Sequence, residues 1–428
     1  MKISIIGLGY VGLPLAIAFD KVYPTVGYDI SEQRINDLQN CNDYNSEISS
    51  SVLKKSKINF TSDVEVLKDS NIYIITVPTP IDEFNQPDLI CLQEAAKTVG
   101  AVLDKNNIVI LESTVFPGAT EEICVPILEK VSGLKYINNS NCHNKDINGF
   151  YCGYSAERIN PGDQDHPLQN IKKITSGSTE DIAREIDNLY KSIIKVGTYR
   201  ASSIAIAEAA KVIENTQRDV NIALINEFAI IFNKLNIDTN EVLEAASTKW
   251  NFHKYEPGLV GGHCIGVDPF YLAHKAISIG YVPKMILSGR SINDNMALYV
   301  KDEVIKLMKS RNIEVRDANI LIMGLTFKED CKDLRNSKVF KLVEEFRKYT
   351  TNIDIFDPMV EQGNEESTTS IELVSSPKQD HYDTIVVTVG HSTFIKMGID
   401  SIKDFAKSNA VIFDVKSIFP VNETDGRL

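Results

Sequence analysis

The chain has 428 residues, of which 43% are hydrophobic and 24% are charged, and its formal net charge is −13. This length predicts two or three domains, each large enough for its own core. The acidic balance argues against a nucleic-acid partner. It does not exclude an anionic substrate, because a site can be locally basic in an acidic protein.

The cysteines indicate the compartment. There are seven, scattered along the chain and never spaced as Cys-x-x-Cys. Such usage favours a reducing cytoplasm over a disulfide framework. No zinc pattern is visible among the seven histidines, so we expect no metal. The first residues lead straight into a strand and no apolar run is long enough to cross a bilayer, so we expect neither a signal peptide nor a membrane span.

A glycine-rich turn follows the first predicted strand. Residues 2–6 (KISII) are a β-branched run and 13–19 open an apolar helix; between them stands Gly7-Leu8-Gly9-Tyr10-Val11-Gly12. A second strand ends at Asp29, 17 residues after Gly12. This order predicts a dinucleotide site, with the pyrophosphate at the helix N-terminus and Asp29 on the adenosine ribose. An acid there favours NAD over NADP. The alternative is a glycine turn that binds no ligand.

Two further strands end in polar residues. Residues 72–77 (IYIITV) precede Thr79, and 108–111 precede Glu112-Ser113-Thr114. Ligands of open α/β sheets bind at the carboxyl ends of strands, so both threonines are candidates for the site. The alternative is that each caps the helix that follows it.

The middle of the chain predicts helices, because no Gly or Pro occurs between Gly197 and Pro257. We expect one helix from Ser202 or Ser203 to about residue 235, and a second from Asp238 or Thr239 to about residue 247. The first helix carries one polar stripe at spacings of three and four, formed by Glu208, Lys211, Asn215 and Arg218. Helix statistics alone favour a solvated face for this stripe.

A second α/β unit follows. Residues 319–323, 353–357, 384–389 and 411–415 predict the strands of another parallel sheet. It lacks a complete Gly-x-Gly-x-x-Gly. Positive charge gathers after its first strand, which makes a nucleotide diphosphate a plausible guest; an ordinary basic loop is the alternative. The residues of this cluster are Lys328, Lys332, Arg335 and Lys338.

Cys264 is the candidate nucleophile. It stands in the segment 258–269 (GLVGGHCIGVDP), where Gly261 and Gly262 before it and Gly266 after it leave the backbone bare for a ligand. A thiol together with a hydride acceptor suggests oxidation through a thiohemiacetal and a thioester.

These motifs resemble the UDP-glucose/GDP-mannose 6-dehydrogenase family, in the family's order and over nearly the whole chain. The family's Gly-x-Gly-Tyr-Val-Gly, Ala-Glu-x-x-Lys-x-x-x-Asn and Gly-Gly-x-Cys-x-x-x-Asp occur here at Gly7–Gly12, Ala207–Asn215 and Gly261–Asp268. Its Gly-x-x-Phe-Lys-x-Asp-x-x-Asp-x-Arg-x-Ser occurs at Gly324–Ser337.

The resemblance implies an α/β fold of three domains. An N-terminal Rossmann NAD-binding domain (1–197) precedes a central long-helix region (198–310) and a C-terminal Rossmann-like UDP-binding domain (311–428). Family members pair through the central helix, so we expect a homodimer or a higher homo-oligomer.

Two motifs differ from those of the glucose enzymes and indicate which branch of the family the chain resembles. The nucleophile segment 260–269 and the segment 154–162 look like the enzymes that act on UDP-N-acetylhexosamines, and 214–219 with Asp414-Val415-Lys416 look like those of capsule, Vi-antigen and O-antigen synthesis. Where glucose enzymes have Glu-Phe-Leu-Arg-Glu, this chain has Glu157-Arg158-Ile159-Asn160-Pro161, so the second glutamate is missing. Lys416 stands near an arginine of the glucose enzymes, and its role stays open.

The resemblance also implies residue roles for a four-electron oxidation at C6 of the sugar. Cys264 is the nucleophile, Lys211 and Asn215 stabilise negative charge on the C6 oxygen, Asp268 activates water, and Thr114 and Glu157 order it. The cofactor would contact Gly7, Gly9, Tyr10, Val11, Gly12, Asp29, Arg34, Thr79, Thr114 and Arg335. The substrate would contact Glu157, Arg158, Ile159, Asn160, Lys211, Asn215, Tyr255, Gly258, Gly261 and Lys328.

Other functions stay open. UDP-glucose or UDP-N-acetylmannosamine could be the better substrate, and the C4 epimer is undecided. A β-hydroxyacid dehydrogenase shares the N-terminal fold and a Lys-x-x-x-Asn helix, but it oxidises an alcohol once and needs no cysteine. A non-catalytic nucleotide-sugar-binding module would explain the two sheets but not Lys211, Asn215 and Cys264 together.

Overall fold

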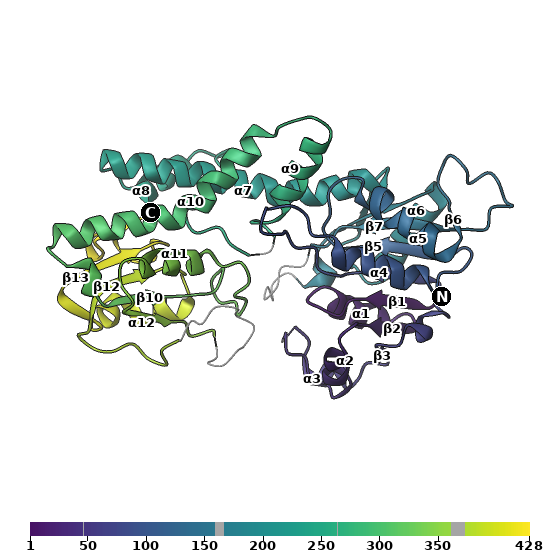
Figure 1. Cartoon of the computed structure of the whole chain (residues 1–428), viewed down its shortest axis with the longest axis horizontal. Helices are drawn as coiled ribbons and strands as arrows, with labels where there is room; N and C mark the ends of the chain where they lie inside the picture. Colours follow the sequence, from purple (N-terminus) through teal and green to yellow (C-terminus); the bar gives the residue numbers. More distant parts are fainter. Residues whose placement is uncertain (46, 159–166, 263, 361–372) are drawn as a thin grey trace. The chain divides into compact units, whose positions relative to one another are not determined.

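The computed structural model in Figure 1 describes residues 1–45, 47–158, 167–262, 264–360 and 373–428. The chain divides into two compact units. Unit 1 comprises 1–214 and 270–281, and unit 2 comprises 215–269 and 282–428. The chain therefore passes from unit 1 to unit 2 inside a long helix. It returns to unit 1 at residue 270 and passes again into unit 2 at residue 282.

Unit 1 is built on a largely parallel sheet in the order β3-β2-β1-β4-β5-β7-β8-β9, with β6 beside β7. Only the β7–β8 pair is antiparallel among the strand pairs of the described residues. The predicted Rossmann arrangement is confirmed, because β1 is flanked by β2 and β4 in parallel register. The strands are β1 (Ile3–Ile6), β2 (Thr25–Tyr28), β3 (Asn59–Thr61), β4 (Ile72–Ile75), β5 (Ile108–Leu111), β6 (Lys135–Tyr136), β7 (Gly149–Ser155), β8 (Lys173–Gly177) and β9 (Thr198–Arg200).

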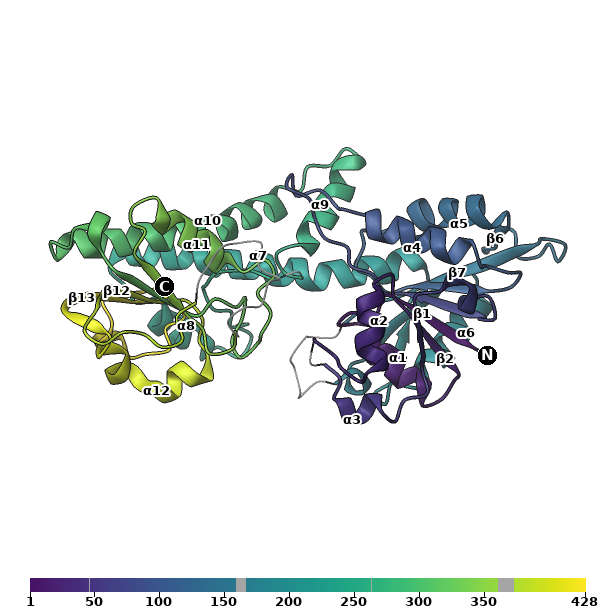
Figure 2. The same cartoon turned by 60° about the horizontal axis from the view of Figure 1, so that its bottom comes forward.

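Helices cover this sheet, as Figure 2 shows. Strands β1, β4 and β5 are buried along their whole length, which explains their continuous apolar runs. Ser31 caps α2 and Thr179 caps α6, each by accepting a backbone N–H of the first turn. The helices are α1 (Gly12–Asp20), α2 (Glu32–Gln39), α3 (Ser50–Leu53), α4 (Ile90–Gly100), α5 (Val125–Ser132) and α6 (Glu180–Lys191), with short helical turns η1 (Val64–Leu67), η2 (Thr120–Cys124) and η3 (Leu168–Asn170).

The predicted central helices are present. Helix α7 runs from Ile204 to Leu235, and α8 (Thr239–Ser247) begins after Asp238, whose side chain accepts the N–H of Glu241. Helix α9 (Asp268–Ser278) starts directly after the Cys264 segment, and α10 (Lys284–Ser310) follows it. The absence of Gly and Pro therefore located α7 and α8 to within about two residues.

Unit 2 contains the second predicted sheet, in the order β11-β10-β12-β13-β14 with parallel pairing throughout the described strands. Alternate residues of β10 face opposite sides: Ile320 and Ile322 enter the core shared with α10 and α11, while Leu321 and Met323 enter the core beneath α12. The elements are β10 (Ile320–Met323), β11 (Ile353–Phe356), β12 (Tyr382–Val387), β13 (Ala406–Asp414), β14 (Gly426–Arg427), α11 (Lys338–Arg347), α12 (Ser392–Lys403), η4 (Val315–Asp317) and η5 (Val421–Glu423).

In the part of the chain that the structure describes, none of the helices combines the length and the apolar character needed to cross a membrane.

Candidate active site

The glycine turn after β1 has the shape that a dinucleotide requires. Gly7 has a φ of +95°, and a side chain at Gly12 would lie 1.8 Å from the Gly7 carbonyl oxygen, so neither position accepts a larger residue. Among the described atoms, none lies within 4 Å of the place where a side chain of residue 9 would begin. The backbone is therefore open at Gly9, immediately before α1, where a pyrophosphate would approach the helix N-terminus.

Asp29 closes this turn from the end of β2. Its two carboxylate oxygens accept the N–H groups of Leu8, at 2.8 Å, and of Ser31, at 2.9 Å. Each carboxylate oxygen has a second lone pair, so Asp29 can still accept ribose hydroxyls. Arg34 is buried and donates to the Leu8 carbonyl, while a salt bridge of 2.8 Å joins it to Asp43. Its predicted contact with the cofactor stays a prediction.

The two candidate threonines of unit 1 contact each other. Thr79 Oγ1 donates to the Thr114 carbonyl at 2.7 Å. Neither caps a helix, because α4 begins after Leu89 and η2 after Ala119. The capping alternative is therefore wrong. The hydrogen bond instead joins the loops after β4 and β5, at the carboxyl ends of these strands.

The polar stripe on α7 is not a solvated face at its start. Glu208 and Lys211 are buried, at 0% and 5% exposed. Glu208 accepts hydrogen bonds from the N–H groups of Gly118 and Thr120, at 2.5 and 2.9 Å, and from Thr120 Oγ1 at 2.6 Å. Burial raises its pKa to about 7, although these donors oppose the shift. The expectation from helix statistics is wrong here because the loop after β5 packs onto the stripe.

Lys211 lies close to the candidate water-ordering carboxylate. Its Nζ is 3.9 Å from Glu157 Oε2, and both side chains are at most 10% exposed. The adjacent Arg158 contacts the carboxylate of Glu214 and the Lys172 carbonyl. Residues Ile159, Asn160 and Pro161 lie outside the described residues.

The candidate nucleophile precedes a helix. The Cys264 carbonyl accepts the N–H of Asp268 at 2.9 Å, and α9 begins at that aspartate. Asn215 Nδ2 donates to Asp268 Oδ2 at 2.6 Å, and Asp268 is 2% exposed. Asn215 and Asp268, predicted to act together with Cys264, are thus paired within unit 2.

The glycines around Cys264 have a different physical reason from the one expected. A side chain at Gly261 would lie 2.7 Å from the Asn336 carbonyl oxygen, and one at Gly262 would lie 2.8 Å from the Phe327 ring. At Gly266 it would meet Asn336 Nδ2 at 3.0 Å. These positions are bare because the segment after β10 packs against them.

Two residues of the predicted basic cluster are paired with carboxylates. Arg335 forms a two-pronged contact with Asp333, at 3.0 and 2.7 Å, and Lys338 lies 2.9 Å from Asp294. Lys328 lies over the Phe327 ring at 5.5 Å. Tyr255 accepts a hydrogen bond from Gln217 at 2.9 Å.

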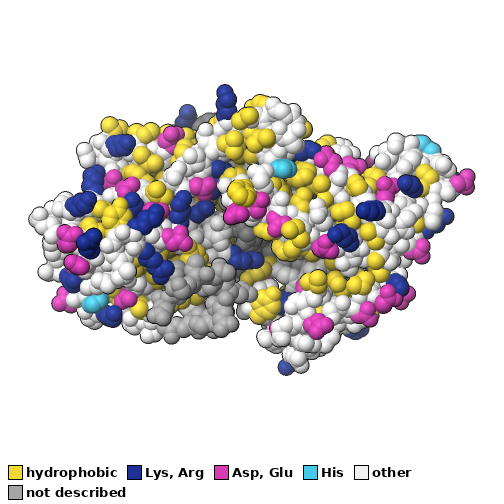
Figure 3. All heavy atoms as spheres, viewed as in Figure 1, with side chains coloured by type: hydrophobic (Ala, Val, Ile, Leu, Met, Phe, Trp, Pro, Cys, Tyr) yellow, Lys and Arg dark blue, Asp and Glu magenta, His cyan; other side chains and the backbone are white. Residues whose placement is uncertain are grey.

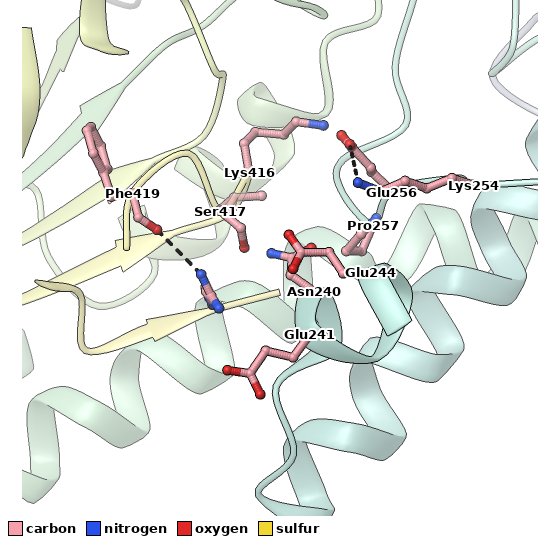
Figure 4. Close-up of a pocket in the computed structure, with 11 residues that line it drawn as sticks. Asn240, Glu241, Glu244, Lys254, Glu256, Pro257, Lys416, Ser417 and Phe419 are labelled. Atoms are coloured by element: carbon pink, nitrogen blue, oxygen red, sulfur yellow. Dashed lines mark hydrogen bonds and ion pairs between the residues drawn. The ribbon is translucent and has the colours of Figure 1, made fainter. Parts of the chain in front are cut away.

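Lys416 lines a cavity of about 310 Å³ in unit 2 (Figure 4). Its charged lining balances, because Lys254, Lys416 and Arg427 are matched by three glutamates, Glu241, Glu244 and Glu256. Arg427 is also paired with Asp238 at 2.6 Å. This lining has no net formal charge, so the cavity by itself does not point to an anion, and the role of Lys416 stays open.

Two buried polar clusters could not be predicted from the sequence. In unit 1, Lys173 Nζ donates to Glu112 Oε2 at 2.6 Å and to the Ala156 carbonyl at 3.0 Å, and Tyr190 also donates to Glu112. Burial raises the pKa of Glu112 despite these partners. Since Glu112 is two residues from Thr114 and Ala156 adjoins Glu157, the cluster joins the loops that carry both candidates.

In unit 2, His391 is fully buried and links the loop after β10 to the start of α12. Its Nδ1 accepts the N–H of Asp330 at 3.0 Å, which places the ring proton on Nε2, 3.2 Å from Asp357 Oδ2. Asp357 also accepts the N–H groups of Leu325 and Thr326. The backbone on both sides of Lys328 is therefore fixed by this histidine and this aspartate.

Comparison with known proteins identifies the family. Residues 1–229 match the NAD binding domain of the UDP-glucose/GDP-mannose dehydrogenase family, 205–295 its central domain and 321–421 its UDP binding domain. The chain belongs to this family. It is therefore an NAD-dependent oxidoreductase of nucleotide sugars, as the sequence predicted.

Several members of the family resemble it over their whole length. The chain is 53% identical to UDP-N-acetyl-D-glucosamine 6-dehydrogenase of Salmonella typhi and 52% identical to that of Pseudomonas aeruginosa, covering 100% of this chain and 99% of each relative. The structure of UDP-D-ManNAc dehydrogenase from Pyrococcus horikoshii matches with a TM-score of 0.85 at 32% identity, covering 100% of this chain and 98% of that one.

Among the described residues, no cluster of three or more His, Cys, Asp or Glu side chains is arranged to hold a metal ion.

Proposed function

We propose that this enzyme oxidises the C6 hydroxymethyl group of a UDP-N-acetylhexosamine to the uronic acid for surface polysaccharide synthesis. The preferred substrate is UDP-N-acetylglucosamine rather than its C4 epimer. Identities of 53% and 52% to UDP-N-acetyl-D-glucosamine 6-dehydrogenases support this substrate. The observation that carries the chemistry is the pairing of Asn215 with Asp268, which follows Cys264 by four residues. Neither residue would be needed by a module that only binds.

The cofactor's place is at the Gly7–Gly12 turn, which fits a dinucleotide because Gly9 is open and Asp29 retains acceptor capacity. When bound there, NAD supplies a hydride acceptor for each of the two oxidations. Asp29 orients the ribose and excludes a 2′-phosphate, and Thr79 and Thr114 shape the loops beside the turn.

The chain's residues then handle the substrate oxygen. The ammonium of Lys211 stabilises negative charge on the C6 oxygen as the hydroxyl proton leaves, and the Asn215 amide, one turn further along α7, is a second donor. The buried setting of Lys211 makes this stabilisation stronger than it would be in water.

Cys264 keeps the aldehyde on the enzyme. Its sulfur forms a bond to C6 and the carbonyl oxygen takes a proton, which gives a thiohemiacetal. This adduct loses a hydride to the nicotinamide and its hydroxyl proton to solvent, which leaves a thioester. Asp268 accepts a proton from water as the water attacks C6, the C–S bond breaks, and the carboxylate and the thiol are released. Glu157 and Thr114 order this water.

We also propose a two-fold dimer through α7. Five large apolar side chains on this helix are 44–58% exposed, and their successive spacings of 7, 11, 7 and 4 return to one face at about 3.6 residues per turn. They are Ile206, Ile213, Leu224, Ile231 and Leu235. A continuous exposed stripe favours an isologous contact with a second copy.

A second apolar patch supports association. Figure 3 shows hydrophobic side chains gathered over the turn between α9 and α10, at the top of the view. Ile277, Ile279, Tyr281, Val282 and Met285 are more than half exposed there. We place the enzyme in the cytoplasm because no disulfide joins its seven cysteines, all of which lie within the described residues.

The substrate is tested by following NADH with a panel of UDP-hexoses under identical conditions. We expect the highest kcat/KM with UDP-N-acetylglucosamine. UDP-N-acetylmannosamine is the second candidate, because the 32% identical structure from Pyrococcus horikoshii belongs to an enzyme named for it. A highest value with UDP-glucose would contradict the proposed substrate class while leaving the chemistry intact.

A further inference from the structure

The segment that leads into Cys264 is attached to the rest of unit 2 by two asparagine side chains. Asn226, from α7, contacts it at Gly258, and Asn336, from the loop after β10, contacts it at Gly262. The nucleophile follows two residues after the second attachment. These two contacts hold the backbone that precedes Cys264, while the N–H of Asp268 holds the Cys264 carbonyl from the other side.

The Asn226 side chain binds both backbone polar groups of Gly258. Its Oδ1 accepts the N–H of Gly258 at 2.8 Å, and its Nδ2 donates to the carbonyl of the same residue at 3.1 Å. The remaining N–H of the amide goes to Asn293 Oδ1 at 2.8 Å. Asn226 is fully buried, so water cannot replace any of these hydrogen bonds unless the core opens.

A buried polar network fixes this amide. Asn293 donates to the carbonyl and the carboxylate of Asp219, at 3.0 and 2.8 Å, and Arg290 donates to the same carboxylate at 2.6 Å. The network thus joins α10, α7 and the Cys264 segment. Buried networks of this kind hold one arrangement rigidly, because their alternatives leave polar groups unpaired.

Asn336 makes the second attachment with both its side chain and its backbone. Its Nδ2 donates to the Gly262 carbonyl at 2.8 Å, and its own carbonyl accepts the Gly262 N–H at 3.2 Å. Gly261 and Gly266 have no room for a side chain against it. Gly261, Gly262 and Gly266 therefore all pack against this one residue, which has a φ of +52°.

We infer that Asn226 and Asn336 are positioning residues that hold Cys264 where its sulfur can capture the C6 aldehyde. This rests on the proposed role of Cys264 as nucleophile. Oxidation of the alcohol to the aldehyde forms no bond to sulfur, whereas the second oxidation proceeds from the thiohemiacetal. Loosening the loop should thus impair the second oxidation more than the first, and the aldehyde should escape.

Asn336→Gly tests the inference with little risk to folding. Glycine accepts a φ of +52° and keeps the main-chain bond to Gly262, so only the amide donor is lost. The matched control is Asn312→Gly, an exposed asparagine with a φ of +57° at the end of α10. NADH formed per UDP-sugar consumed is measured at completion, with a hydrazine present to trap free aldehyde.

For the wild type and Asn312→Gly we expect two NADH per sugar and no trapped aldehyde. For Asn336→Gly the ratio should fall toward one, with trapped aldehyde and with KM values for both substrates within about twofold of wild type. A ratio that stays at two overturns the inference, whether or not kcat falls.

Asn226→Asp is the second variant, because aspartate keeps the shape but cannot donate to the Gly258 carbonyl. Asn221→Asp is its control, because Asn221 is a half-buried asparagine on the same helix whose amide donates only to the nearby Gln217 carbonyl among the hydrogen bonds of the described residues. If thermal melting shows that Asn226→Asp does not fold, Asn336→Gly decides alone. Cys264→Ala distinguishes failure of the proposed function from failure of the inference. A Cys264→Ala enzyme that still forms two NADH per sugar refutes the proposed function. If Cys264→Ala cannot form two NADH per sugar while Asn336→Gly still does, only the inference is refuted.

Discussion

Asn215 Nδ2 donates to Asp268 Oδ2 across 2.6 Å, which joins the long helix α7 to the first residue of α9. The amide is uncharged, so it orients the carboxylate without neutralising it. This hydrogen bond is compatible with the proposed roles of the two residues, Asp268 as a base toward water and Asn215 as a donor to the substrate oxygen. This pair is where the Ala-Glu-x-x-Lys-x-x-x-Asn motif and the nucleophile motif meet.

Replacing the amide with a second carboxylate should therefore damage catalysis more than folding. In Asn215→Asp the two acids would repel each other and one pKa of the pair would rise. We expect kcat to fall at least about tenfold and the acidic limb of its pH profile to move to higher pH. Steady-state kinetics over pH 5–9 check this, with Asn221→Asp as the control. An unchanged pH profile would show that Asn215 does not act through Asp268.

We expect Asp29 to set the choice of cofactor. With Asp29→Ala, the KM for NAD should rise about tenfold or more and the preference for NAD over NADP should narrow, because the repulsion of a 2′-phosphate is gone. Asp29 also holds the N–H of Leu8, so thermal melting should accompany the kinetics. If the ratio of kcat/KM values for NAD and NADP stays at its wild-type value, Asp29 does not contact the ribose.

Glu208 should make the stability of the protein depend on pH. Burial raises its pKa from 4.5 to about 7, so between these values the folded state keeps a proton that the unfolded state loses. Its contribution to stability is complete below pH 4.5 and is lost as pH rises toward 7, by about 3 kcal/mol. Glu208→Gln should flatten the pH dependence of the urea midpoint in this window. Glu185→Gln, at an exposed position of α6, should leave it steep; equal slopes in wild type and Glu208→Gln would contradict the assignment.

The apolar stripe on α7 predicts the behaviour of a surface variant. Ile231 is 44% exposed, so Ile231→Asp should leave a folded chain but place a charge in the proposed dimer contact. Light scattering at micromolar concentration should then show a monomer, or a dimer weakened at least about tenfold. Ile90→Asp, which changes an isoleucine that is 65% exposed on α4, should not alter the mass. A dimer of undiminished stability in Ile231→Asp would exclude the stripe as the interface.

The sequence predicted the parts of the site whose chemistry is local. The glycine turn, Asp29, the bounds of α7 and the Cys264 segment follow from backbone conformation, helix propensity and short spacings. The burial of Glu208 and Lys211 could not be read from helix periodicity, because it depends on a loop some 90 residues earlier in the chain. The same holds for Asn226 and Asn336, whose partners lie 32 and 74 residues away.

The glycines near Cys264 show why such long-range contacts matter for interpretation. From the sequence, a bare backbone beside a thiol suggested contact with a ligand. In the structure Phe327 and Asn336 occupy the adjoining space. A glycine in the sequence indicates only that some group lies close to the backbone. Tertiary packing decides whether that group is a ligand or another part of the protein.

The number of NADH molecules formed per UDP-N-acetylglucosamine consumed tests the central claim most directly. It is measured at completion with limiting sugar, for the wild type and for Cys264→Ser. We predict two for the wild type, and for Cys264→Ser a loss of at least about a thousandfold in the steady-state rate of complete oxidation. One NADH per sugar in the wild type, or a Cys264→Ser enzyme that still forms two at a rate near wild type, would contradict oxidation through a cysteine thioester.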